Sequence, residues 1–111
     1  MIENSKIRSH KFLEGMYGDS YFPTFLVDEC KEILLELCER MESEKPTNVA
    51  GVHPLTHSAT EKLNALEDEF LAAGSEIETA ARECLMDDFD FILKAYGWEH
   101  LDLDEAVPRD W

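Results

Sequence analysis

Apolar side chains recur every three or four positions along several stretches of the chain, which is the spacing of one buried face of an α-helix. The clearest stretch covers residues 24–43. Its apolar positions are Leu26, Cys30, Ile33, Leu37 and Met41, while Glu29, Glu32, Glu36 and Glu39 occupy the opposite side. The pattern therefore predicts an amphipathic helix with an acidic outer face.

Two further helices have recognisable ends. Residues 9–17 carry apolar side chains at helical spacing and are followed by Gly18, which predicts a short helix. Residues 54–73 repeat the helical pattern. Pro54 suits the first turn of this helix because its missing N–H is not needed there, and Gly74 suits the position just after its end.

A fourth helix is predicted over residues 76–96, with Gly97 as its stop. Ser75 and Glu78 match a capping box, in which the serine hydroxyl accepts from a backbone amide and the glutamate reaches back. No window alternates apolar and polar residues with a period of two, so strands are not expected. The sequence therefore predicts an all-α fold, a small antiparallel helical bundle of about four helices.

The domain organisation follows from these helices. Residues 1–8 are expected to form a loose N-terminal arm, and residues 9–111 a single helical-bundle domain of common size. The segment after Gly97 is acidic but retains apolar side chains. These apolar side chains are expected to dock the C-terminal tail on the bundle. They are Trp98, Leu101, Leu103, Val107 and Trp111.

Acidic residues outnumber basic ones by 25 to 10, a formal net charge of −15. Residues 1–47 carry ten acidic and six basic side chains, and residues 48–111 carry fifteen and four, so the excess is concentrated in the second half. Such a field attracts basic proteins and cations and repels nucleic acids and anionic membranes. The simpler alternative is that the surplus charge only keeps a small protein in solution.

Several function classes lack their sequence signals. No segment approaches the roughly 18 apolar residues of a membrane span, and the N-terminus has no apolar core of a secretory signal. Neither a glycine-rich phosphate loop, a nucleophile elbow nor calcium-loop spacing occurs. Basic residues interleaved with aromatic ones, typical of nucleic-acid binding, are also missing. Neither a membrane nor a nucleic acid is therefore expected as a partner.

The three cysteines, Cys30, Cys38 and Cys84, form no CxxC pair. Cys30 and Cys38 lie eight residues apart in one predicted helix, about 12 Å along its axis, which is too far for a disulfide. We interpret all three as small core residues of a protein in the reducing cytoplasm. The alternative is a catalytic thiol.

Four segments of the chain together resemble a known family. They are Asp19-Ser20-Tyr21-Phe22-Pro23, residues 55–64 (LTHSATEKLN), Gly74-Ser75-Glu76-Ile77-Glu78, and residues 88–97, which run from Asp88-Phe89-Asp90-Phe91-Ile92 to Tyr96-Gly97. They resemble a family of small acidic bacterial proteins, the domain of unknown function 5713, over nearly the whole chain from Phe12 to Trp111. The resemblance implies a bacterial, cytoplasmic origin. It implies no activity and assigns no functional residue.

Asp88 is an anomaly in the last predicted helix. On a helical wheel it falls near the middle of the inner stripe formed by Ile77, Ala81, Cys84, Phe91, Ile92 and Ala95. A carboxylate buried there is costly unless it is paired or hydrogen-bonded. Three interpretations stay open: an acid or metal ligand inside the bundle, a carboxylate satisfied by a Tyr, Trp or backbone donor, and a local bend that turns Asp88 outward.

The same helix has a second apolar stripe, Met86, Phe89, Leu93 and Tyr96. A helix that is apolar on two sides is either central in its fold or covered by a partner. Docking of the C-terminal tail, a homodimer contact and a different protein partner are the three alternatives.

A candidate polar ligand face lies on the third helix. His53, His57 and Glu61 follow one another at intervals of four, and Asn64 lies beside His57 on the wheel. The spacing suits a transition metal, but the set lacks the HExxH arrangement and His57 lies off the apolar stripe. A solvated polar face is the favoured interpretation, so no metal or other cofactor is predicted.

Two functions are compatible with these features. The first is a non-enzymatic acidic interaction or regulatory module, which binds a basic protein and in one version neutralises it, or binds a second copy of itself. The alternative is a small metal-dependent or acid–base enzyme that uses His57 and Asp88. No catalytic residue is assigned.

Overall fold

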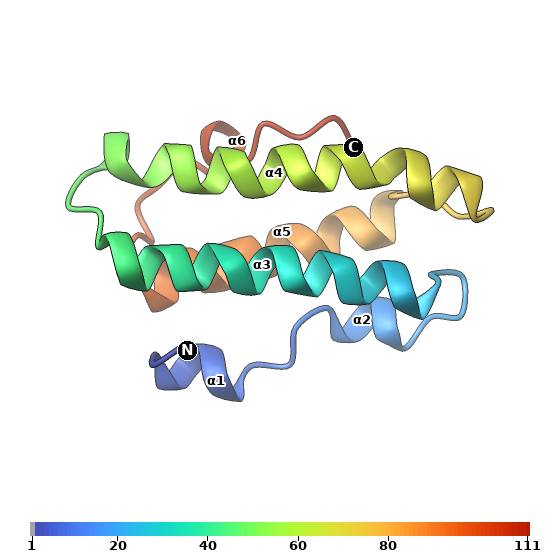
Figure 1. The fold of residues 1–111 in the computed structure, drawn as a ribbon, viewed down its shortest axis with the longest axis horizontal. Coiled ribbons are helices and arrows are strands. Elements are labelled where there is room, and N and C mark those ends of the chain that lie inside the picture. The colour runs from blue at the N-terminus through green and yellow to red at the C-terminus, as the bar shows by residue number, and fades with distance from the viewer. Residues whose placement is uncertain (1) are drawn as a thin grey trace.

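The computed structural model describes residues 2–111 and consists of helices and connecting loops (Figure 1). Three helices are long: α3 (Thr24–Glu44), α4 (Val49–Ala72) and α5 (Thr79–Ala95). Three are short: α1 (Ser5–Ser9), α2 (Glu14–Tyr17) and α6 (Leu103–Ala106). Residues 2–111 contain no strand, and the predicted all-α bundle is confirmed. Over the same residues, no helix has both the length and the apolar character needed to cross a membrane.

The helices are arranged around an antiparallel hairpin of α3 and α4 (Figure 1). Helix α5 lies behind this pair, α1 and α2 pack against α5, and α6 packs against both α4 and α5. The C-terminal tail, with α6, therefore docks on the bundle as predicted.

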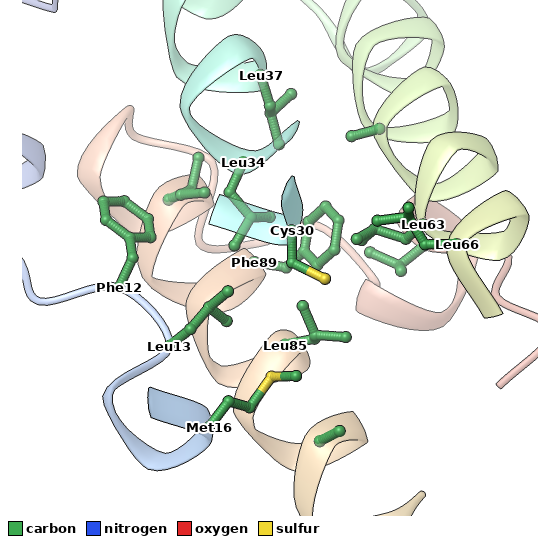
Figure 2. Packing of buried hydrophobic residues seen from close by; sticks show 14 of the residues in the cluster. Phe12, Leu13, Met16, Cys30, Leu34, Leu37, Leu63, Leu66, Leu85 and Phe89 are labelled. Atoms are coloured by element: carbon green, nitrogen blue, oxygen red, sulfur yellow. The ribbon is translucent and has the colours of Figure 1, made fainter. Parts of the chain in front are cut away.

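The core collects side chains from all three long helices and from the segment that leads into α2. Figure 2 shows Leu34, Leu63 and Phe89 converging between α3, α4 and α5. Phe12, Leu13 and Met16 close the side of this cluster that faces α2. Burying one such side chain contributes roughly 1.5–3 kcal/mol, so apolar burial is the main force that holds the helices together.

Glycines end α4 and α5 at the predicted positions. Gly74 and Gly97 have φ values of 80° and 84°, a left-handed conformation that glycine adopts without steric cost. The next residues close the helices: the Ser75 amide donates to the Phe70 carbonyl at 2.8 Å, and the Trp98 amide to the Leu93 carbonyl at 2.7 Å. Both ends are Schellman motifs.

The predicted start of the third helix at Pro54 is wrong, because α4 begins at Val49. The Asn48 side chain caps the helix by accepting from the Gly51 amide at 2.9 Å, and asparagine is among the best residues for this position. Pro54 consequently lies in the second turn, where its ring costs one backbone hydrogen bond.

The predicted capping box is also wrong. Helix α5 begins at Thr79, and its N-cap, Glu78, makes no side-chain capping bond. The Ser75 hydroxyl is buried and has no hydrogen-bond partner within residues 2–111. The reason is that the Ser75 amide already closes the end of α4, and the extended residues that follow place Ile77 in the core.

The N-terminal region differs from the prediction in two ways. Of the single helix expected over residues 9–17, only Ser9, the last residue of α1, and Glu14–Tyr17, which form α2, are helical. The expected loose arm is docked over residues 2–8, while residue 1 lies outside the described residues. Ile7 is only 2% exposed, and the Asn4 amide group donates to the Ala95 carbonyl at 3.0 Å.

Candidate functional site

Asp88 on α5 is buried, with 6% of its surface exposed. Its Oδ1 lies 2.8 Å from His10 Nε2, and its Oδ2 accepts from the Leu13 amide at 2.7 Å. Both carboxylate oxygens therefore have partners, which offsets the cost of removing the group from water. A backbone donor was one of the partners expected from the sequence, whereas no sequence pattern pointed to His10.

His10 is held in place by aromatic side chains as well as by Asp88. Its ring stacks on Phe91 with centroids 3.9 Å apart, and meets Phe12 edge-on at 4.6 Å. When the carboxylate is ionised it can only accept, and His10 Nε2 is then the donor of this bond. His10 and Asp88 are 78 residues apart in sequence, and no local pattern relates positions so far apart.

The Asp88 bond to the backbone explains why the first predicted helix is broken. Leu13 has a φ of 55°, a left-handed conformation that strains a residue with a side chain. The strain is tolerated because the Leu13 amide bonds Asp88 and its side chain is fully buried. The chain turns there and begins α2 at Glu14. Asp88 thus anchors the N-terminal segment to α5.

The predicted polar face on α4 lies under the chain's own tail. His57 Nε2 donates to the Glu105 carbonyl at 2.9 Å, and Asn64 Oδ1 accepts from the Asp110 amide at 3.0 Å. The His53 ring stacks on that of His57 with centroids 5.2 Å apart, and Glu61 is exposed. In the described part of the chain, no group of three or more His, Cys, Asp or Glu side chains is placed to hold a metal ion.

The second apolar stripe of α5 is covered within the molecule. Phe89 and Leu93 are in the core, and Met86 and Tyr96 are half-buried against it. Helix α5 packs against α1, α2 and α6. The stripe therefore offers little free apolar surface to a second protein.

Glu42 near the end of α3 joins three parts of the fold. It accepts from the Glu3 amide at 2.7 Å, from the Asn4 amide at 3.1 Å, and from the Tyr96 hydroxyl. Partial burial opposes ionisation of Glu42, but these three donors outweigh it and lower the pKa of the carboxyl. Burial, and then the bond to Glu42, raise the pKa of Tyr96.

The cysteines are unsuited to nucleophilic chemistry. Burial raises the pKa of both the Cys30 and the Cys38 thiol to about 12. Burial also raises the pKa of Cys84, which is half-exposed. Since the thiolate is the reactive form, these side chains act as small apolar residues at neutral pH.

A negatively charged groove follows the exposed face of α3. Its first hollow, of about 350 Å³, is lined by Glu29, Glu32, Ile33, Glu36, Lys62, Ala65 and Leu66. The second, of about 410 Å³, is lined by Glu3, Glu36, Glu39, Arg40, Glu42 and Ser43. Glu36 belongs to both, so we treat the two hollows together as the acidic groove.

The charges of the acidic groove are only partly compensated. Lys62 pairs with Glu36, and Arg40 pairs with Glu44. Glu29, Glu32 and Glu39 are exposed. The floor near Lys62 is apolar, because Ile33 and Leu66 come together where α3 and α4 meet. The groove lies on the half of the sequence with the smaller net charge, so the charge of each half did not indicate its position.

Comparison with known protein families gives a match that covers most of the chain. The sequence pattern of a family described as a family of unknown function (DUF5713) matches residues 6–111. No curated protein and no solved structure matches the chain significantly.

Proposed function

The chain belongs to the family of unknown function DUF5713, and from this premise we propose that it is a non-enzymatic interaction module whose acidic groove binds a basic segment of another protein. The family supplies no activity, so the proposal rests on the surface of the molecule. In this proposal the protein regulates its basic partner, in one version by neutralising it.

The observation that carries the proposal is the combination of charge and shape along α3. Glu29, Glu32 and Glu39 place carboxylates without an ion-pair partner in residues 2–111 on one helix face, where they line two adjoining hollows. The apolar floor is small, because Leu66 is buried and Ile33 is half-buried, and it gives a partner a limited apolar contact at the centre of the charge. A charged rim around an apolar centre is the usual anatomy of a protein interface.

The groove defines the chemistry of the partner. An amphipathic helix suits it, with Lys or Arg side chains toward the glutamates and a few apolar side chains toward Ile33 and Leu66. Electrostatic attraction would speed association and make it sensitive to salt, while the apolar contact would add affinity.

The alternative function, a small enzyme that uses His57 and Asp88, receives less support from the geometry. Such chemistry needs both side chains to face one ligand. Asp88 is engaged by His10 and Leu13, whereas His57 is engaged by the Glu105 carbonyl. A cytoplasmic location is part of our proposal, and the free buried thiols of Cys30 and Cys38 support it because such thiols are typical of reducing compartments.

The test compares two variants of equal charge. The groove variant carries Glu29→Gln, Glu32→Gln and Glu39→Gln, and the dispersed variant carries Glu14→Gln, Glu76→Gln and Glu99→Gln. Immobilised wild-type protein is expected to retain a basic protein from a lysate of the source organism at low salt and to release it at high salt. With the purified partner, the groove variant should bind at least about tenfold more weakly in calorimetry.

The dispersed variant provides the control because it loses the same number of charges. It should bind the partner nearly as well as the wild type. Equal weakening in both variants, or a retained protein without a basic segment, would contradict the proposal. Light scattering measures the mass of the free protein in solution. We expect the mass of a monomer, because the second apolar stripe of α5 is covered within the molecule.

A further inference from the structure

A pocket of about 370 Å³ lies between α5 and the C-terminal tail. It is lined by Arg82, Asp104, Val107, Pro108, Arg109 and Trp111. Two guanidinium groups thus share one hollow in a chain whose formal net charge is −15. The pocket's two arginines outnumber its one acidic side chain, Asp104, whereas glutamates predominate in the acidic groove. The pocket falls within the usual size range of small-molecule sites.

Two buried donors in this lining have no partner in residues 2–111. Trp111 is only 7% exposed, and its Nε1 makes no hydrogen bond. Arg82 Nε is buried and likewise unpaired. Each buried donor left unpaired is costly, and the cost is larger for a charged group. An acceptor in the pocket that reaches both atoms would remove both penalties.

The second arginine retains donors for a ligand. Arg109 Nη1 contacts Asp104 Oδ1 at 3.2 Å and the Val107 carbonyl at 3.3 Å. A guanidinium has five N–H donors, so these contacts leave most of them free. They also hold the Arg109 side chain against the tail, which reduces the entropy that it loses when it binds a ligand.

We propose that this pocket binds the oxyanion group, a carboxylate or a phosphate, of a small metabolite. Arginine presents planar, paired donors that match such groups. The Trp111 indole N–H supplies one further neutral donor. The site is independent of the acidic groove and of any protein partner.

The test follows the indole N–H signals in nitrogen-15 NMR. The chain has two tryptophans, and a Trp98→Phe variant assigns the signal of Trp111. Inorganic phosphate and acetate are titrated separately, with sodium chloride holding the ionic strength constant. We expect a saturable shift of the Trp111 signal and a much smaller shift of the Trp98 signal. The anion that saturates at the lower concentration identifies the ligand as phosphate-bearing or carboxylate-bearing.

Variants separate binding from general electrostatics. Arg82→Gln is expected to weaken the phosphate or acetate titration at least about tenfold, as is usual when a charged donor is lost. Arg40→Gln, which removes an arginine on α3, should leave it unchanged. Circular dichroism shows whether each variant folds. If Arg82→Gln does not fold, Arg109→Gln replaces it and is expected to weaken the same titration. A shift without saturation, or equal titrations in the wild type and in both pocket variants, would overturn the proposal.

Discussion

At the scale of single residues, Asp88 connects parts of the chain that are distant in sequence. One oxygen bonds the His10 ring, and the other bonds the amide of Leu13, whose backbone is strained. These two bonds explain why a carboxylate can be buried in this helical bundle: it anchors the N-terminal segment to α5. Glu42 has a similar function at the other end of the N-terminal segment.

Asp88→Ala is expected to lower the free energy of unfolding by about 2–4 kcal/mol. The reason is that the buried Leu13 amide loses its acceptor and the His10 ring loses its hydrogen-bond partner. Urea denaturation followed by circular dichroism measures the change. Asp87→Ala on the exposed side of α5 is the matched control and should stay within about 0.5 kcal/mol. Equal effects of the two substitutions would contradict the anchoring role.

Glu42 gives a prediction for pH dependence. Its pKa in the folded protein lies below the ordinary value of 4.5, so the folded state favours the ionised form. The resulting stabilisation is complete above the unfolded-state pKa and is lost as the pH falls through the folded-state pKa. Glu42→Gln should therefore cost about 1 kcal/mol at neutral pH. The difference from wild type should shrink steadily below pH 4.5.

The control for this pH profile is Glu39→Gln, an exposed glutamate of the same helix. Its substitution relieves repulsion along α3, so it should raise stability slightly at neutral pH, opposite in sign to the effect of Glu42→Gln. A Glu42→Gln penalty that persists in acid would show that the lost contacts are not those of an ionised carboxylate.

At the scale of helices, the ends are determined by the backbone groups that need partners. Asn48 starts α4, and Gly74 ends it with the Ser75 amide turned back onto Phe70. Because the Ser75 amide closes the end of α4, Ser75 lies outside α5, which begins at Thr79. A short motif can therefore fit a capping pattern and still serve the preceding helix.

One asparagine and one serine substitution distinguish the observed start of α4 from the capping box predicted at Ser75. Asn48→Ala should cost about 1 kcal/mol because the Gly51 amide loses its cap. Ser75→Ala should stay within about 0.5 kcal/mol, because the buried Ser75 hydroxyl has no partner in the described chain. Thermal or urea unfolding measures both. If Ser75→Ala lowers the stability as much as Asn48→Ala does, the result would support the predicted capping box at Ser75.

At the scale of the whole molecule, the charge distribution matters more than the total. The acidic groove follows α3, whereas an arginine-lined pocket lies between α5 and the tail. The glutamates of the groove repel one another across single turns of α3. Such repulsion lowers stability, so a function of these charges would have to offset that cost.

The groove variant tests this view on the free protein. Replacing Glu29, Glu32 and Glu39 by Gln should raise stability by about 1 kcal/mol at low salt, a rise of several degrees in the melting temperature. The gain should shrink at high salt because the repulsion is screened. The dispersed variant should gain less. If the groove variant is not stabilised at low salt, its glutamates do not form a repulsive set.

The sequence by itself determined the helical class and the approximate position of the long helices. Apolar residues at helical spacing predicted α3 and α5, because only one face of each helix can be buried at low cost. The glycines at positions 74 and 97 predicted two helix ends for an equally local reason. The anomaly at Asp88 was also visible, since the helical wheel needs only neighbouring residues.

The tertiary structure decided what satisfies each polar group. His10 reaches Asp88 across 78 positions, the tail binds His57 and Asn64 on α4, and Arg82 meets Trp111 in one pocket. No periodic pattern in the sequence predicts these pairs. Each one joins residues of different segments, so it depends on how the helices pack and not on the spacing within one helix. The break at Leu13 has the same origin: a bond to Asp88 on α5 outweighs the local preference to continue a helix.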